Sequence, residues 1–242
     1  MIDYLLIGGM IYLAFMYLGM PLLVLKQNSM PAKYELSPFS AEEENTPDEE
    51  FKAYDKDILN NGFHHIISSQ VKHQKTTTFF NLYIHPTKKL SILLTSIDNP
   101  NVKKLQYLEV TQLFSDDTLL SIMNSSVASF YPKSPRKVGF RYPKVKKVSQ
   151  LVKITEYILE EYLSNKRAIS LPEGEELKLL ERFFNEEQRE LIDKGYVSPH
   201  IVQEERMLTI KGAFFMTWKS LWPVKQILAY REFAHAQSIL KN

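Results

Sequence analysis

The N-terminal segment from Tyr4 to Leu25 contains no Asp, Glu, Lys, Arg or His, and it is bounded by Asp3 and Lys26. A helix over this segment would be about 33 Å long at 1.5 Å per residue. That length is sufficient to cross a hydrocarbon core of about 30 Å. We therefore expect residues 1–26 to form a transmembrane anchor, so that the rest of the chain works at the surface of a bilayer.

Two other interpretations of the apolar segment fit less well. A cleavable signal peptide has a basic n-region and an apolar stretch of about 7–15 residues, whereas this chain begins with Met1, Ile2 and Asp3 and its apolar stretch is longer. A buried core helix of this length would normally carry a polar stripe. The segment is more typical of the signal-anchor of a single-pass membrane protein.

The charges that flank the segment predict its orientation. Lys26 and Lys33 follow it, whereas only Asp3 precedes it. Positive charge beside a span is retained on the cytoplasmic side, so we expect the bulk of the chain to be cytoplasmic. The chain has no cysteine, which excludes disulfides and thiol chemistry without identifying a compartment.

After the anchor, residues 27–50 are expected to form an acidic tether. This segment contains the runs Glu42–Glu44 and Asp48–Glu50 and lacks the apolar spacing of a core element. Such runs are usually solvated and repel one another. Residues 51–242 are long enough for one globular domain.

The first part of that domain, residues 51–147, has the pattern of an antiparallel sheet. Runs rich in β-branched and aromatic residues alternate with short turn signals, and no segment between them is long enough for a helical crossover. We expect a meander of four or five strands at His64–Val71, Thr76–His85, Leu90–Ile97, Leu105–Phe114 and Thr118–Met123.

The second part, residues 148–242, changes to helical periodicity. Apolar residues recur at helical spacing over Leu151–Tyr162 and Leu177–Leu191. Lys194-Gly195 resembles a helix stop, and Ser198-Pro199 resembles the start of a further helix. The expected class is α+β, with helices covering one face of an antiparallel sheet.

A basic stretch between residues 133 and 147 is the most unusual chemical feature. No acidic residue interrupts it, and aromatic residues are interleaved. Cations near an anionic leaflet, with aromatic rings at headgroup level, favour contact with anionic lipid or an acidic protein partner. Single-stranded nucleic acid is a less favoured partner for a tethered protein, and pairing with the Glu42–Glu50 run would make the stretch inert. Its seven cations are Lys133, Arg136, Lys137, Arg141, Lys144, Lys146 and Lys147.

The C-terminal region holds both tryptophans of the chain, Trp218 and Trp222. An apolar stripe in this region would suit an in-plane helix at a membrane surface, with the tryptophans as interfacial anchors. The same stripe would equally suit a helix that faces a protein core. Its members are Met207, Ile210, Phe214, Trp218 and Leu221.

No catalytic or metal-binding motif is evident, and the sequence indicates no cofactor. His64, His65, His73 and His85 come from neighbouring predicted strands, but adjacent strand residues point to opposite faces. The pair Asp116-Asp117 fits a hairpin turn at least as well as a carboxylate site. No group combines a nucleophile, a base and an orienting partner.

The sequence therefore predicts a single-pass, membrane-anchored α+β protein that acts as a non-enzymatic binding or scaffolding module at the cytoplasmic face of a membrane. The alternative is a membrane-tethered enzyme that acts on a lipid or a membrane-associated substrate through an unfamiliar site. The sequence does not indicate an oligomeric state.

Overall fold

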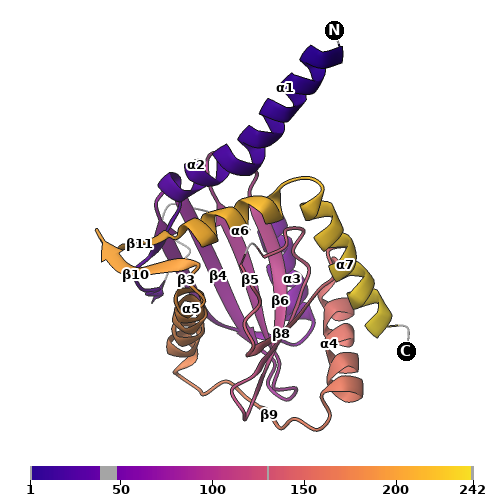
Figure 1. Ribbon diagram of the computed structural model, residues 1–242. Helices are drawn as coiled ribbons and strands as arrows, with labels where there is room; N and C mark the ends of the chain where they lie inside the picture. Colours follow the sequence, from indigo (N-terminus) through magenta and orange to yellow (C-terminus); the bar gives the residue numbers. More distant parts are fainter. Residues whose placement is uncertain (1, 39–47, 130, 241–242) are drawn as a thin grey trace. The chain divides into compact units, whose positions relative to one another are not determined.

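The computed structural model describes residues 2–38, 48–129 and 131–240 and belongs to the α+β class (Figure 1). As expected, an apolar N-terminal helix precedes a sheet-rich part with C-terminal helices. The helices are α1 (Ile2–Ala14), the π-helical turn η1 (Phe15–Gly19), α2 (Met20–Gln27), α3 (Glu49–Asn60), α4 (Val148–Tyr162), α5 (Glu176–Asp193), α6 (Ile210–Ser220) and α7 (Val224–Ile239). The strands are β1 (Ser29–Pro31), β2 (Ser37–Pro38), β3 (His64–His73), β4 (Thr76–Ile84), β5 (Ser91–Asp98), β6 (Leu105–Phe114), β7 (Leu119–Met123), β8 (Lys137–Arg141), β9 (Ala168–Ile169), β10 (Val197–Val202) and β11 (Glu205–Leu208).

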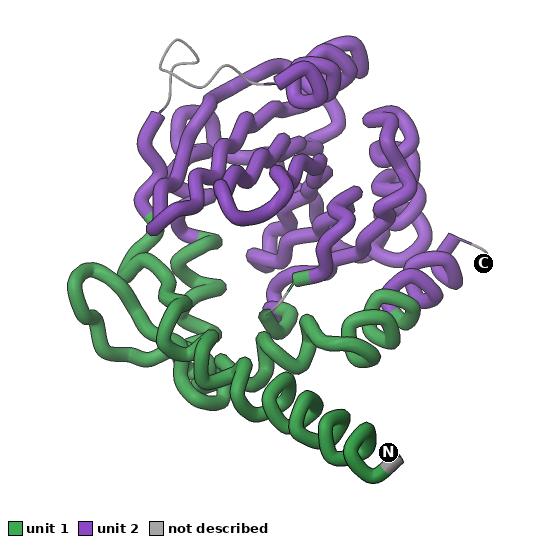
Figure 2. The backbone as a smooth tube through the Cα atoms, turned by 90° about the horizontal axis from the view of Figure 1, so that it is seen from above, with its two compact units in different colours: residues 1–34, 129–133, 183–231 green, residues 35–128, 134–182, 232–242 purple. Residues whose placement is uncertain are grey.

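The chain divides into two compact units, coloured green and purple in Figure 2. Unit 1 comprises residues 1–34, 129–133 and 183–231, and unit 2 comprises residues 35–128, 134–182 and 232–242. The N-terminal segment thus belongs to the same unit as α6, although some two hundred residues separate them in sequence.

Unit 2 contains a mixed sheet in the order β2-β3-β4-β5-β6-β7-β8, with β9 paired to β6, among the described residues. The strands β3 to β7 are antiparallel neighbours in sequence order. The predicted meander is nevertheless wrong for the sheet as a whole, because β8 pairs with β7 in parallel and β2 extends the other edge. The long connection between β7 and β8 permits the parallel pairing, since it can carry the chain back to the start of β7.

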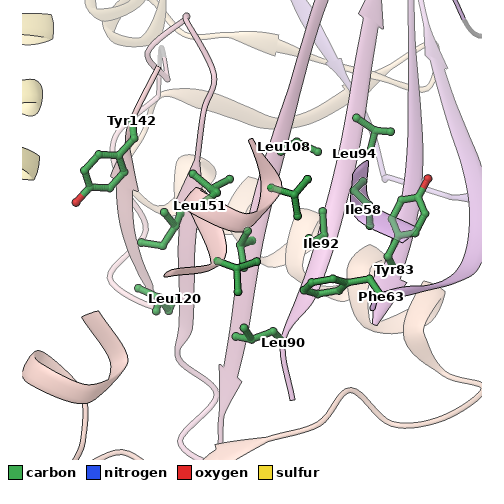
Figure 3. Close-up of a cluster of buried hydrophobic side chains, with 14 of the residues drawn as sticks. Ile58, Phe63, Tyr83, Leu90, Ile92, Leu94, Leu108, Leu120, Tyr142 and Leu151 are labelled. Carbon is green, nitrogen blue, oxygen red and sulfur yellow. The ribbon is translucent and has the colours of Figure 1, made fainter. Parts of the chain in front are cut away.

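The core of unit 2 lies between this sheet and the helices α3 and α4 (Figure 3). Ile58 of α3 and Leu151 of α4 pack with alternate residues of the strands, such as Ile92 and Leu108. Because strand side chains alternate between faces, these inward residues define one apolar face of the sheet. Both helices therefore cover the same face.

Unit 1 contains a smaller antiparallel sheet in the order β1-β11-β10. Strands β10 and β11 are joined at Gln203 and Glu204, which both have positive φ (52° and 62°). A two-residue hairpin turn of this kind needs the left-handed region at both positions. The helix start predicted at Ser198-Pro199 is wrong, since these residues lie in β10.

The segment expected as a tether contributes to both units. Strand β1 pairs with β11, and β2 pairs with β3. Glu42–Glu44 lie outside the described residues. Asp48 caps α3, because its Oδ1 accepts a hydrogen bond from the backbone N–H of Phe51 at 3.0 Å.

The substitution Ile58→Ala tests the core of unit 2. Ile58 is fully buried, so its truncation should lower the free energy of unfolding by about 2–5 kcal/mol. Denaturant unfolding of the detergent-solubilised chain measures the change. The neighbouring Leu59→Ala is the matched control, because the Leu59 side chain is exposed on the same helix and its loss should have little effect. Equal effects of the two substitutions would contradict this core.

Candidate membrane interface

The N-terminal helix is long and apolar enough to cross a membrane over Asp3–Gln27. Every residue from Asp3 to Phe15 is exposed in the structure, including large apolar side chains such as Leu5 and Ile11. Exposed contiguous apolar surface of this extent marks a site of membrane or protein interaction. The first half of the helix therefore has no covering within the described protein.

The second half of the same helix belongs to the core of unit 1. Pro21 is buried, and Val24 and Leu25 pack against a cluster that contains Met30, Leu191, Val197 and Leu208. Helix α2 also contacts α6 extensively. The first half of the apolar segment is thus exposed, and the second half packs against the core of unit 1.

Helix α6 packs on unit 1 through small side chains. Gly212, Ala213 and Thr217 are buried along one side of the helix. A Cβ atom on Gly212 would lie 2.0 Å from the carbonyl oxygen of Tyr196, so only glycine permits this approach. Thr209 caps the helix, since its Oγ1 accepts from the N–H of Gly212 at 3.1 Å.

Two of the large apolar side chains of α6, Ile210 and Trp218, are exposed, whereas Met216 packs against the core cluster of unit 1. The exposed fraction is 64% for Ile210 and 44% for Trp218, and the ring of Phe214 meets the ring of Trp218 edge-on with centroids 5.3 Å apart. Trp222, just after the helix, is 72% exposed. Of the stripe predicted for one helix, Met207 lies instead in β11.

Two hydrogen bonds tie the tryptophans to the N-terminal helix. The indole Nε1 of Trp218 donates to the carbonyl oxygen of Tyr17 at 2.9 Å, and the Tyr17 hydroxyl donates to the carbonyl oxygen of Trp222. In an α-helix the Tyr17 carbonyl would accept from the N–H of residue 21, which is proline and has none. Trp218 therefore satisfies a carbonyl that Pro21 leaves without its usual donor.

Three of the seven cations in the basic stretch pair with carboxylates of unit 2. Arg136 lies 3.5 Å from Asp117, Lys137 lies 2.8 Å from Glu109, and Arg141 lies 2.9 Å from Glu232. These distances join side-chain nitrogen and carboxylate oxygen atoms. Much of the basic charge is thus neutralised locally.

The other four cations are exposed, and none forms an ion pair with a carboxylate of the described residues. Lys133 lies in unit 1, whereas Lys144, Lys146 and Lys147 directly precede α4 in unit 2. The Lys144 ammonium also lies 5.4 Å from the ring centroid of Phe233.

The acidic run does not neutralise the basic stretch where the structure describes it. Asp48 pairs with Lys104, and Glu49 pairs with Lys52. The remaining residues Glu42–Glu44 of the run lie outside the described residues.

Glu109 is the one strongly buried carboxylate of these pairs, with an exposed fraction of 7%. Its Oε1 accepts from Ser121 Oγ at 2.5 Å and from Lys137 Nζ at 2.8 Å. Burial alone would raise the pKa of Glu109, but the charge of Lys137 and the hydrogen bonds from Lys137 and Ser121 outweigh it and lower the pKa. Glu109 is therefore held ionised on the face of the sheet opposite the apolar core.

The residues considered for catalysis have ordinary structural partners. Asp116 forms an ion pair with Lys166, with a nitrogen–oxygen distance of 2.5 Å, and Asp117 forms one with Arg182 at 2.6 Å. Both aspartates lie in the turn between β6 and β7, which these pairs stabilise. His65 Nε2 lies 3.0 Å from Ser68 Oγ. Over the described ranges, no group of three His, Asp or Glu side chains is arranged to hold a metal ion.

Sequence reasoning named the tryptophans and the cations as candidates but missed the protein groups that bond to them. Glu109 is the only acidic residue within β6, at a position that alternates with the inward Leu108 and Val110. An isolated charge in an apolar strand could have predicted a buried partner of opposite charge. Pro21 could likewise have predicted that the carbonyl of Tyr17, one turn earlier, lacks its backbone donor.

Comparison with known proteins gives no match to a family model, a curated protein or a solved structure.

The substitution Lys137→Met tests the buried ion pair. It leaves Glu109 buried without its cation, and because the exposed fraction of Lys137 is 27%, the unfolding free energy at neutral pH should fall by about 3 kcal/mol, at the low end for buried pairs. The loss should shrink as the pH falls, because the unpaired carboxyl of the variant binds a proton at a higher pH than the paired carboxyl of the parent, and it should vanish below the lowered pKa of Glu109 in the parent. Denaturant unfolding across pH measures both effects.

The double variant Glu109→Gln/Lys137→Met should recover most of the lost stability, and Lys146→Met, at an exposed lysine, should cost little. Unchanged stability of Lys137→Met at neutral pH would show that the pair contributes nothing.

Proposed function

We propose that the chain is a single-pass membrane protein whose folded units form a non-enzymatic binding or scaffolding module at the cytoplasmic face. The observation that carries the proposal is the apolar helix Asp3–Gln27, which is of spanning length and bare over its first half. Exposure of so many large apolar side chains to water would be costly, at about 25 cal/mol per Å². A bilayer removes this cost.

The packing of α2 favours a permanent anchor over a cleaved signal sequence. Removal of the apolar segment would take Val24 and Leu25 away from the cluster around Met30 and Leu208 and would uncover α6. A cleaved signal peptide leaves the mature protein with its core intact, so the packing of Val24 and Leu25 supports an apolar segment that is retained.

The orientation with the bulk of the chain in the cytoplasm is supported by Lys26 and Lys33, which follow the helix, against Asp3 before it. Short flanking stretches carry most weight in setting orientation. The proposed topology has the N-terminus on the outer side.

For the binding role, the structure narrows the candidate cations. Arg136, Lys137 and Arg141 are held by carboxylates, so we propose that the exposed group Lys144, Lys146 and Lys147 contacts anionic lipid headgroups. Each lysine near an anionic surface contributes about 1 kcal/mol, so three together contribute about 3 kcal/mol. An acidic protein partner would be recognised by the same charges.

A membrane-tethered enzyme is the second candidate. The observation that favours it is the buried network of Glu109, Ser121 and Lys137, in which the Ser121 hydroxyl donates a hydrogen bond to the Glu109 carboxylate. The lowered pKa of Glu109 makes it a weak base near neutral pH, so this network fits a structural ion pair better than a catalytic group.

The topology can be tested with Val102→Cys, because the chain has no other cysteine and Val102 is exposed in the loop between β5 and β6. A membrane-impermeant maleimide should label this variant only after the cells are lysed. The cysteine-free parent chain is the control for background labelling. Labelling of intact cells would place unit 2 outside and contradict the cytoplasmic assignment.

The lipid contact can be tested with a donor dye on Gln150→Cys, at the exposed start of α4, and an acceptor dye on lipid headgroups of nanodiscs. Anionic lipid should raise energy transfer, and salt should reverse the rise because it screens exposed charges. Replacement of Lys144, Lys146 and Lys147 by Gln should abolish the rise.

The matched control replaces Lys72, Lys75 and Lys103 by Gln, which removes the same charge from exposed positions elsewhere in unit 2. This variant should retain the response. An equal response of both triple variants, or none in the parent, would refute lipid contact by the basic group and favour an acidic protein partner.

A further inference from the structure

Helix α6 buries small residues and exposes two large apolar side chains. Its protein-facing side consists of Gly212, Ala213, Thr217 and the partly buried Met216, whereas its outward side presents Ile210 and Trp218. A surface helix of a soluble domain normally buries its large apolar residues and exposes polar ones. The outward side of α6 is therefore suited to an apolar environment.

Four polar side chains of α6 donate hydrogen bonds to backbone carbonyl oxygens of the protein. The hydroxyl of Thr217 donates to the carbonyl of Ala213 at 2.7 Å, and that of Ser220 donates to Met216 at 2.8 Å. Lys211 and Lys219 turn their ammonium groups toward backbone carbonyls of unit 1, at 2.6 Å from Lys194 and 2.9 Å from Ser129. Both ammonium groups thus lie against the backbone of unit 1.

The hydrogen bond between Trp218 and Tyr17 places the outward side of α6 at a defined position along the N-terminal helix. Tyr17 lies 14 residues after Asp3, or about 21 Å along the helix. A hydrocarbon core of about 30 Å that begins at Asp3 would extend about 9 Å beyond Tyr17. The level of Trp218 and Trp222 therefore falls within the apolar length of the span.

We infer that the outward face of α6, together with Trp222, lies in the boundary between lipid headgroups and acyl chains, so that lipid covers Ile210, Phe214 and Trp218. This inference rests on the proposed anchoring of the chain and adds a second contact of unit 1 with the same leaflet. In-plane helices typically lie about 5–10 Å deep. This depth agrees with the distance of about 9 Å by which the hydrocarbon core would extend beyond Tyr17. Aromatic side chains prefer this level because one end of the ring is apolar and the other can remain hydrated.

Intrinsic fluorescence tests the inference directly, because Trp218 and Trp222 are the only tryptophans in the chain. The full chain is reconstituted into vesicles of phosphatidylcholine that carries bromine either near the headgroup or near the end of the acyl chain. Shallow bromine should lower the emission about twofold, and deep bromine should lower it much less, as expected for rings at interfacial depth. Aqueous iodide should quench weakly.

Single-tryptophan variants assign the signal. Trp222→Phe leaves Trp218 as the only emitter and retains its bond to Tyr17, and Trp218→Phe leaves Trp222. The water-exposed reference combines both replacements with Val102→Trp in unit 2, which iodide should quench and bromine should not. The parent chain alone supports the conclusion if a variant fails to fold.

The outcomes separate this inference from the anchor. Flotation of the chain with vesicles after an alkaline wash reports the anchor by itself. If the chain floats but its tryptophans respond to iodide and not to bromine, α6 is in water and the inference is wrong while the anchor stands. Strongest quenching by deep bromine would also overturn it, because α6 would then lie within the hydrocarbon core. Failure to float would reject the anchor and the inference together.

Discussion

The hydrogen bond from the Trp218 indole to the Tyr17 carbonyl is the interaction on which the organisation of unit 1 depends. Pro21 deprives that carbonyl of its normal donor, and the helix passes through a π-helical turn at Phe15–Gly19 just before the proline. Neighbouring helices and local π-helical adjustments are the usual means of satisfying a backbone interrupted by proline in an apolar helix. Here the donor is the Trp218 indole of α6. The same hydrogen bond therefore satisfies the Tyr17 carbonyl and positions the outward aromatic side chains of α6.

The basic stretch illustrates how a sequence cluster can divide into different roles. Alternation along β8 places Lys137 and Arg141 on one face of the sheet, where Glu109 and Glu232 hold them. Three residues beyond the strand, the chain emerges with Lys144, Lys146 and Lys147 exposed before α4. The first group pairs with carboxylates of the protein, and the second group is exposed without such a pair among the described residues. A count of basic residues alone overstates the charge available for binding.

The strands β3 to β7 could be predicted because each has a β-branched or aromatic run bounded by turn residues. Strand β8 could not, because Lys137–Arg141 is basic and contains Gly139, and its parallel pairing depends on the path of a long loop. The hairpin at Gln203-Glu204 lacks the Asn-Gly signal of such turns. The tryptophans were evident as candidate anchors, but their attachment to Tyr17 depends on tertiary packing across 201 residues.

That separation also bears on how the chain is made. At about 5–20 residues per second, α6 leaves the ribosome about 10–40 s after Tyr17. During this interval the apolar helix exists without the partner that covers α2, and the sheet strands of unit 2 are being synthesised. A bilayer that receives the helix early would shield it until α6 arrives. Unit 1 is therefore assembled from segments that are translated far apart in time, and its N-terminal helix has to wait for α6.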